Sequence, residues 1–274
     1  MKILIVGLGL IGASYAKGLS QKGHELYGVD KILSTCRLAM ERGYVLEAST
    51  DVLDYLTLVD VLVISLYPND ILPFMKQYHH QFPQHLIITD TCGIKKPICE
   101  EATLLALPAK FVGSHPMAGR EKVGIEYADE KIFSGANFLI TPIENTNEKA
   151  IAIVKQLATD LGFGKIHLIS PEFHDQMIAY TSQLTHAIAV SLVNSEANVD
   201  VTPFIGDSYR DLTRIAMINE KLWSELFNEN RDYLIYEIDK FITELAKLKR
   251  SLLYENEEEL KQMFLSSKEK RGKM

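Results

Sequence analysis

The chain has 274 residues, of which 47% are apolar and 24% charged, and its net charge is −7. This length suits one large or two modest domains, and the composition is that of an ordinary globular protein. The negative charge argues against nonspecific nucleic-acid binding, which depends on broad basic surfaces, and the apolar runs are too short for a membrane span.

Three cysteines, Cys36, Cys92 and Cys99, bear on the cellular compartment. Their number is odd and their spacing is not that of a metal site, so we expect free thiols and no metal. The N-terminal residues lead directly into an apolar strand, without the pattern of a secretory signal peptide. We therefore expect a cytoplasmic protein.

The first predicted strand covers residues 3–6, and a glycine-rich turn and a helix over residues 13–19 follow it directly. This order is typical of a loop that binds a dinucleotide pyrophosphate, because the phosphates meet free N–H groups at the helix N-terminus. Gly7 allows the tight turn, Gly9 lets the phosphates approach, and Gly12 lets the helix pack on the strand. The alternative is a glycine turn that serves packing alone. The predicted cofactor contacts are Gly7, Leu8, Gly9, Leu10, Ile11 and Gly12.

A second strand, over residues 26–29, ends at Asp30. A carboxylate about twenty residues beyond the glycine turn accepts hydrogen bonds from ribose hydroxyls and repels a 2′-phosphate. Asp30 therefore predicts NAD over NADP, although the neighbouring Lys31 could weaken that preference.

Further apolar strands follow, and the spacing predicts a helix from about Asn147 to residue 161 before the last of them. Continuous apolar strands separated by helices indicate a parallel sheet covered on both faces, so we predict a Rossmann-type, doubly wound α/β domain over residues 1–169. Ligands bind beyond the carboxyl ends of such strands, which makes Ser65, Leu66, Pro68 and Asp90 further candidates for cofactor binding. The strands are predicted at residues 61–66, 86–90, 111–113, 138–140 and 166–169.

An all-helical domain is predicted for residues 170–274. Ser170, Pro171 and Glu172 form a typical helix start, and the helix is expected to run to about Asn198. Further helices are predicted over residues 211–217, 220–227 and 230–253, and residues 267–274 are expected to fray. The helix over 230–253 has apolar residues at helical spacing: Leu234, Ile238, Phe241, Ile242, Leu245 and Leu248. Such residues more often form an internal core than an interface. We nevertheless favour a homodimer, because an all-helical domain this small often completes its core by pairing with a second copy.

His115 is the first candidate catalytic residue. It follows the predicted strand over residues 111–113 and precedes Pro116, at the strand end where this fold places catalytic groups. Imidazole is suited to general base catalysis near neutral pH. The alternative is a histidine that only caps a loop.

Two further groups of polar residues lie in the helical part. Asp175, Ser182 and His186 are separated by seven and four residues, so they are expected to share a helix face, which is either part of a site or exposed to solvent. Arg210 and Arg214 are four residues apart, and guanidinium groups bind carboxylates in a bidentate way. The arginines therefore suggest an anionic substrate, unless they only form salt bridges with Asp207 and Asp211.

Together these segments resemble the prephenate and arogenate dehydrogenase family of tyrosine biosynthesis, over nearly the whole chain. The resemblance rests on three motifs in order behind the glycine turn: residues 115–119 with Glu121, the pair His174 and Asp175 with His186 eleven residues after the aspartate, and residues 209–216. It implies a Rossmann-type domain, a helical domain, and oxidative decarboxylation of a small dianionic substrate with NAD.

The resemblance also implies a role for individual residues. His115 would take the proton of the substrate ring hydroxyl, and Arg214 would bind a substrate carboxylate. His186 would lie near the substrate, Glu121 at the pocket entrance, and Asp175 on the helical side of the site. The implied reaction converts prephenate to 4-hydroxyphenylpyruvate, CO2 and NADH. Arogenate as the substrate, another two-domain NAD dehydrogenase of the 3-hydroxyacid type, and an NAD-binding regulatory protein without turnover remain alternatives.

The chain departs from the family pattern at Gly93 and in residues 182–186, where a serine-histidine-leucine-proline-histidine run is common. Many members have a serine that helps to hold the substrate hydroxyl, and this serine falls on Gly93 here, within the run from Asp90 to Lys95. Thr91 or Ser114 could supply a hydroxyl instead. These departures leave the choice between prephenate and arogenate open.

Overall fold

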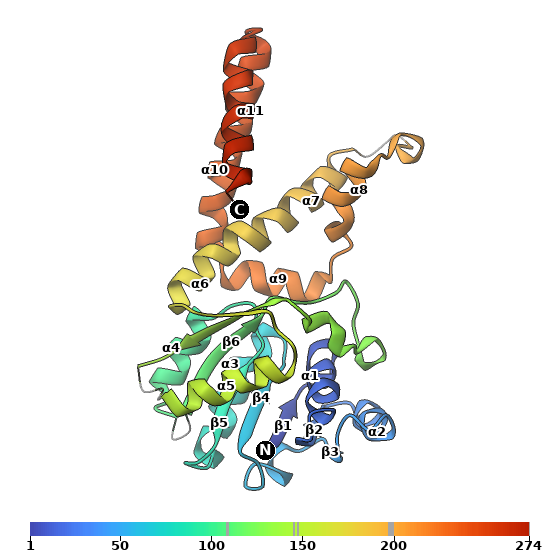
Figure 1. The fold of residues 1–274 in the computed structure, drawn as a ribbon, viewed down its shortest axis with the longest axis vertical. Coiled ribbons are helices and arrows are strands. Elements are labelled where there is room, and N and C mark those ends of the chain that lie inside the picture. The colour runs from blue at the N-terminus through green and yellow to red at the C-terminus, as the bar shows by residue number, and fades with distance from the viewer. Residues whose placement is uncertain (108–109, 145, 147, 197–199, 274) are drawn as a thin grey trace. The chain divides into compact units, whose positions relative to one another are not determined.

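The computed structural model describes residues 1–107, 110–144, 146, 148–196 and 200–273 (Figure 1). The chain divides into two compact units, Met1–Asn230 and Arg231–Met274. No helix in this described part of the chain has the length and apolarity that crossing a bilayer requires. The candidate site lies entirely in the first unit, which is described before the second.

The first unit is built on a sheet that has eight strands within the described residues, in the order β3-β2-β1-β4-β5-β6-β7-β8. Strands β1 to β6 are parallel, as the sequence predicted. Strand β3 was not predicted, because it is a three-residue edge strand without a buried face. The bounds are β1 Lys2–Val6, β2 Glu25–Val29, β3 Glu47–Ser49, β4 Val61–Ile64, β5 Ile87–Asp90, β6 Lys110–Pro116, β7 Asn137–Pro142 and β8 Lys165–Leu168.

The prediction of a fully parallel sheet is wrong at one edge. Strand β7 runs antiparallel to β6, and β8 is parallel to β7. A parallel neighbour requires a crossover connection, usually a helix. The described connection from β6 to β7 contains only the short 3-10 turns Ile125–Tyr127 and Glu130–Phe133, so the chain returns in the opposite direction.

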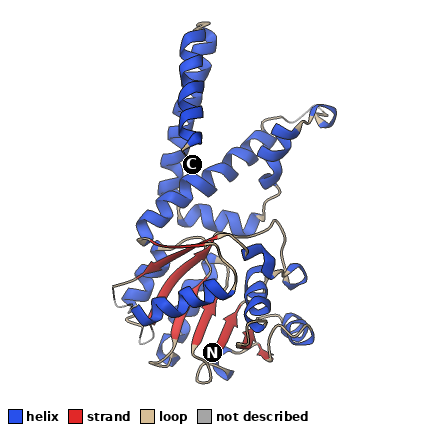
Figure 2. Cartoon of the chain, in the orientation of Figure 1, coloured by secondary structure: helices blue, strands red, loops and turns tan. Residues whose placement is uncertain are grey.

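Helices cover both faces of the sheet (Figure 2). Alternate residues of β1 point to opposite faces: Ile3 and Ile5 join one core cluster, and Leu4 and Val6 join the other. Helices α1 and α5 contribute to the first cluster, and α3 and α4 to the second. The bounds are α1 Leu10–Ser20, α2 Leu33–Glu41, α3 Pro68–Tyr78, α4 Lys96–Leu104 and α5 Glu148–Asp160; the predicted start of α5 at Asn147 lies outside the described residues.

The helical segment that follows begins as predicted. The Ser170 hydroxyl accepts a hydrogen bond from the Phe173 N–H, and Pro171 occupies the first turn of α6. A π-helical turn at Ala179–Gln183 separates α6 from α7, and the predicted end at Asn198 lies outside the described residues. The helix predicted over 211–217 instead begins at Asp207 and ends in a 3-10 turn. The bounds are α6 Pro171–Ile178, α7 Leu184–Asn194, α8 Asp207–Thr213 with the 3-10 turn Arg214–Ala216, and α9 Glu220–Glu229.

The second unit consists of two helices, α10 Arg231–Leu253 and α11 Glu257–Gly272. Glu259 of α11 accepts hydrogen bonds from Ser251 at 2.6 Å and from Arg250 at 3.0 Å, which ties the helices together at their connection. The prediction that the C-terminal residues fray is wrong for residues 267–272, because α11 extends to Gly272. Residue 274 lies outside the described residues. Glutamates in the first turn of α11 and Lys270 and Arg271 in its last turn complement the helix dipole and stabilise its ends.

Candidate active site

The glycine turn after β1 leaves one open position beside a helix N-terminus. Gly7 has φ +92°, and a Cβ on it would lie 2.2 Å from the Ser65 carbonyl oxygen. A Cβ on Gly12 would lie 1.9 Å from the Gly7 carbonyl oxygen, so both positions require glycine for close packing. At Gly9 a Cβ would meet no atom within 4 Å. Gly9 also caps α1 without a side-chain hydrogen bond, so the first N–H groups of the helix are available to a phosphate.

Asp30 lies at the end of β2, next to this turn. Its Oδ2 accepts a hydrogen bond from the Leu8 N–H at 2.9 Å, and its Oδ1 accepts one from the Ile32 N–H at 2.9 Å. The carboxylate is therefore fixed against the glycine turn and remains partly exposed. Open space at Gly9, a free helix N-terminus and a fixed acid beside it together fit a dinucleotide.

The other candidate cofactor residues have different surroundings. Ser65 is partly exposed and accepts a hydrogen bond from the Thr91 hydroxyl at 3.1 Å, while Leu66 packs partly buried against the core. Pro68 is buried in the first turn of α3. Asp90 is fully buried, so its side chain has no surface for a cofactor to contact.

Asp90 is instead part of a buried ion pair with Lys95, which the sequence analysis did not identify as a site residue. The Lys95 ammonium donates to Asp90 Oδ2 and, at 2.8 Å, to the Ser114 carbonyl oxygen. Asp90 Oδ1 accepts from the Ser114 N–H at 3.1 Å, and the Ser114 hydroxyl donates to the Asp90 carbonyl oxygen at 2.6 Å. These bonds fix the backbone directly before His115.

His115 lies within β6 and is linked to two buried residues of α6. Its Nδ1 lies 2.9 Å from His174 Nε2, and His174 Nδ1 lies 2.6 Å from Asp175 Oδ1. The Asp175 carboxylate also accepts the backbone N–H groups of Lys95 at 2.9 Å and Lys96 at 2.8 Å, at the start of α4. His174 and Asp175 are buried, whereas His115 is partly exposed.

Burial is the main influence on the charge of both histidines. It lowers the pKa of His115 well below its ordinary value, and the neighbouring His174 and Lys95 lower it further. Burial also lowers the pKa of His174, although Asp175 acts in the opposite direction. Both imidazoles are therefore neutral at pH 7, and a neutral imidazole can accept a proton.

Gly93 lies beside the outer edge of the His115 ring. A Cβ on Gly93 would lie 3.6 Å from His115 Nε2 and 3.4 Å from Leu226 Cδ2 of α9. The two hydroxyls that could replace a serine at this position already have partners: Thr91 donates to Ser65, and Ser114 is buried against Asp90. The structure therefore offers neither as an obvious substitute.

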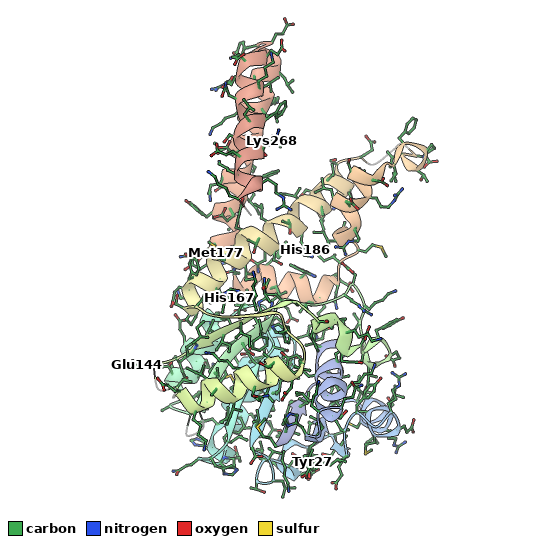
Figure 3. The ribbon with its side chains drawn as sticks, in the orientation of Figure 1. Tyr27, Glu144, His167, Met177, His186 and Lys268 are labelled. Carbon is green, nitrogen blue, oxygen red and sulfur yellow. The ribbon has the colours of Figure 1, made fainter. Side chains whose placement is uncertain are left out.

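A second group of side chains surrounds His186 on α7, which is labelled in Figure 3. Its Nδ1 donates to the Ser182 carbonyl oxygen at 2.9 Å, and its ring stacks on Trp223 with centroids 3.6 Å apart. Arg214 forms an ion pair of 2.6 Å with Glu121. Burial lowers the pKa of His186, while the Ser182 carbonyl and the Glu121 charge act in the opposite direction.

Two expectations about the helical residues need correction. Asp175 and His186 do not act from one helix face, since Asp175 is buried against His174 and α4 whereas His186 stacks on Trp223. The π-helical turn between them adds an extra residue and rotates the later part of the helix. Arg210 forms an exposed ion pair of 2.6 Å with Asp207, which is the structural alternative considered for it.

Helix α9 links the two groups of side chains. Trp223 contacts His186, and Leu226, one turn further, approaches Gly93 beside His115. The same helix is tied to the nucleotide-binding half, because Glu225 accepts the N–H of Asn69 at the start of α3 at 3.0 Å. The general base candidate, the arginine and the glycine turn thus belong to one compact unit, although sequence reasoning had not identified Trp223.

Comparison with known proteins identifies one family, whose two domain models together match most of the chain. The family model described as prephenate dehydrogenase, nucleotide-binding domain, matches residues 15–167, and the prephenate dehydrogenase dimerization domain matches residues 170–266. The structure is similar to prephenate dehydrogenase from A. aeolicus in complex with hydroxyphenyl propionate and NAD+, at 30% identity and TM-score 0.90, covering 100% of this chain and 98% of that one.

Two other relatives carry related names. Arogenate dehydrogenase from Synechocystis is 31% identical, with a TM-score of 0.86 and coverage of 100% of this chain and 99% of that one. Prephenate dehydrogenase from Bacillus subtilis is 28% identical over 279 residues, which cover 98% of this chain and 75% of that protein.

Proposed function

The chain belongs to the prephenate dehydrogenase family, and we propose that it converts prephenate and NAD+ to 4-hydroxyphenylpyruvate, CO2 and NADH. One observation carries the proposal: His115 is partly exposed and its Nδ1 is occupied by His174, so its Nε2 is the nitrogen available to a substrate. A carboxylate-binding arginine and a dinucleotide-binding turn lie in the same unit.

NAD is the cofactor, and when bound it supplies the acceptor for a hydride. The free N–H groups at the start of α1, beside Gly9, would hold the pyrophosphate, and Asp30 would hold the ribose hydroxyls. Ser65 and Leu66, at the carboxyl end of β4, remain proposed neighbours of the cofactor.

His115 performs the proton chemistry in this proposal. The substrate is a cyclohexadienol, and oxidation of its carbinol carbon requires loss of the hydroxyl proton. His115 Nε2 takes this proton, which contributes a factor of about 10² to 10⁴ to the rate of a typical enzyme. The resulting ring ketone is conjugated to the carbon that carries the carboxylate, so loss of CO2 restores aromaticity and makes the reaction irreversible.

Arg214 and the residues around it would hold the substrate by its charge. The guanidinium is exposed and now pairs with Glu121, so a substrate carboxylate can take a place beside it. His186, fixed by Ser182 and Trp223, would contact the ring. Arg210 stays a weaker candidate because its described ion pair is with Asp207.

The experiment that tests the proposal follows absorbance at 340 nm with NAD and either prephenate or arogenate. A rise with prephenate supports it, and a flat trace with both, in protein that binds NAD, supports a regulatory NAD-binding protein instead.

We expect His115→Asn to lose about two to four orders of magnitude in kcat, with NAD affinity unchanged by calorimetry. Near-normal turnover of this variant would refute the role of His115.

Arogenate is the second candidate substrate. It is supported by the ion pair of Arg214 with Glu121, which places a carboxylate beside the arginine. Arogenate carries an ammonium where prephenate carries a keto group, and Glu121 could accept that ammonium while Arg214 binds the carboxylate. We therefore expect Glu121→Gln to lower kcat/KM for arogenate more than for prephenate. Equal effects on both substrates would leave Glu121 without a role in this choice.

A homodimer through the helical region is also part of the proposal. Apolar side chains of α10 that the sequence left open as core or interface are exposed, and a second copy could cover them: Phe241, Ile242 and Leu245. Replacing all three with glutamate should convert a dimer to a monomer in sedimentation, whereas Lys247→Glu, at an exposed charged position, should not. A monomeric wild type would contradict the proposal.

The boundary between the nucleotide-binding and helical domains is proposed at residues 169/170. Strand β8 ends at Leu168 and α6 begins at Pro171, which supports this boundary, although α6 to α9 pack into one compact unit with the sheet.

A cytoplasmic location is likewise proposed. It is supported by Cys36, Cys92 and Cys99, which are free, buried thiols of the kind that persist in a reducing compartment.

A further inference from the structure

The buried contacts of His115 determine which of its nitrogens carries a proton. An ionised carboxylate only accepts hydrogen bonds, so the 2.6 Å contact between Asp175 and His174 requires a proton on His174 Nδ1. Neutral His174 then has a lone pair on Nε2. The 2.9 Å contact between His174 Nε2 and His115 Nδ1 in turn requires the proton of His115 on Nδ1. The lone pair of His115 is thereby left on Nε2, beside Gly93.

The carboxylate at the start of this chain is well supported. Asp175 accepts the backbone N–H groups of Lys95 and Lys96, which belong to the N-terminal end of α4. Two fixed donors and the positive end of a helix dipole suit an acceptor-only anion. The Asn230 side chain donates to the Asp175 carbonyl oxygen at 2.9 Å, and this bond holds the backbone of α6 in place.

We propose that His174 and Asp175 are positioning residues for the base, which hold His115 as the Nδ1-protonated tautomer and then take up its charge. This inference rests on the proposed function and deepens it. When His115 Nε2 binds the hydroxyl proton of the substrate, the Nδ1 proton moves to His174 Nε2. The products of this step are a neutral His115 protonated on Nε2 and an imidazolium of His174 beside the Asp175 carboxylate.

The surrounding charges favour His174 as the final place of the positive charge. The charged groups that act on the two rings are Lys95, Asp90 and Asp175. Lys95 disfavours a cation on His115, for which no carboxylate offsets it. On His174, by contrast, Asp175 accepts a direct hydrogen bond and favours the charged form. The substrate proton therefore stays on His115 Nε2, while the positive charge is stabilised on His174, one residue away from the reacting atoms.

The first test observes the tautomer without any substrate. The ¹⁵N spectrum of the wild-type protein with NAD, with His115 assigned by comparison with His115→Asn, reports protonation at each ring nitrogen. We expect a protonated Nδ1 and an unprotonated Nε2 at neutral pH. A neutral His115 protonated on Nε2 would overturn the proposal. Because this readout is independent of turnover, it stays informative even if neither prephenate nor arogenate is a substrate.

The second test separates positioning from uptake of charge. In His174→Gln the amide can accept from His115 and donate to Asp175, so the tautomer is retained, but the amide cannot take a proton. We expect kcat to fall roughly tenfold or more, and the acidic limb of the kcat/KM profile to move to lower pH, because His115 becomes a weaker base. In His174→Leu both functions are lost, and we expect a larger fall of about 10² to 10⁴.

Controls distinguish this role from a merely structural one. His167→Gln makes the same replacement at an exposed histidine of β8 and should leave kcat and the pH profile unchanged (Figure 3). Thermal unfolding and NAD binding check that the variants fold, and His174→Gln alone suffices if His174→Leu does not. Wild-type kcat and an unchanged pH profile in His174→Gln would overturn the uptake of charge by His174.

Discussion

Trp223 stacks on His186, with the ring centroids 3.6 Å apart and an angle of 27° between the ring planes. The contact joins α9 to α7 and fixes the imidazole from one side, while the Ser182 carbonyl holds its Nδ1. No hydrogen bond of its Nε2 is found among the described residues, so we propose that this nitrogen is available to the substrate. Since Trp223 is the only tryptophan of the chain, it also gives this site a fluorescence signal of its own.

Trp223→Leu should weaken substrate binding while the reaction itself continues. An aromatic pair contributes about 0.5 to 1.5 kcal/mol beyond burial, so we expect the KM for prephenate to rise roughly 2- to 10-fold and kcat to change less. Trp223→Phe keeps a ring against His186 and should lie close to the wild type. Quenching of Trp223 fluorescence by substrate provides an independent check, and a wild-type KM in the leucine variant would contradict the prediction.

Arg214→Ala should raise the KM for prephenate by one to two orders of magnitude, because a charged hydrogen bond contributes about 1 to 3 kcal/mol. The present partner of Arg214 is Glu121, on an exposed surface, so we expect little loss of stability. Initial-rate kinetics with saturating NAD measure the effect. Lys76→Ala is the matched control, since it removes an exposed cation of α3 that pairs with Glu101. An unchanged KM for Arg214→Ala would remove Arg214 from the substrate site.

Local sequence patterns predicted the parts of the site that depend on single elements. The glycine turn, Asp30 and the Ser170 helix start each follow from a few adjacent residues, and the structure has them in the expected conformation. The direction of β7 did not follow, because it depends on a connection without a crossover helix. The helical end of α11 did not follow either, since its polar residues are stabilised by capping and end charges and not by burial.

The contacts between elements were beyond sequence reasoning. His115 and His174 are 59 residues apart, and their hydrogen bond depends on how α6 packs beside β6. Lys95 is another example, because a lysine at the start of a helix usually reaches solvent, whereas this one is fully buried against Asp90 and the Ser114 carbonyl. Trp223 gave no signal of its own, since an aromatic residue in an amphipathic helix usually belongs to a core.

The lowered pKa values of His115 and His174 predict how activity and stability depend on pH. His115 stays neutral below its ordinary value of 6.5, so we expect the kcat/KM plateau to extend below pH 6.5 before the acidic limb begins. Between the lowered folded pKa and 6.5, the unfolded chain binds more protons than the native state. The free energy of unfolding attributable to His115 and His174 should therefore rise with pH through this window and level off above 6.5.

Rate profiles and urea unfolding from about pH 5 to about pH 8 measure both effects. His115→Asn removes one of the titrating groups, so the dependence of its unfolding free energy on pH should be weaker than that of the wild type. An acidic limb centred above pH 6.5 would show that His115 is not the neutral base described above.

Gly93→Ser should be tolerated by the fold and should strengthen substrate binding. The backbone of Gly93 lies outside the left-handed region, and a new Cβ would meet only ordinary contacts, 3.4 Å from Leu226 and 3.6 Å from His115 Nε2. A hydroxyl at this place would lie beside His115 Nε2, where the proposed function puts the substrate oxygen that is deprotonated. One neutral hydrogen bond contributes about 1 kcal/mol, so we expect the KM for prephenate to fall roughly fivefold, with the melting temperature unchanged. Gly93→Ala adds the Cβ without the hydroxyl and should leave the KM near that of the wild type. An equal KM in the serine and alanine variants would mean that the hydroxyl finds no partner in the substrate, and that this chain orients the reacting oxygen through His115 alone.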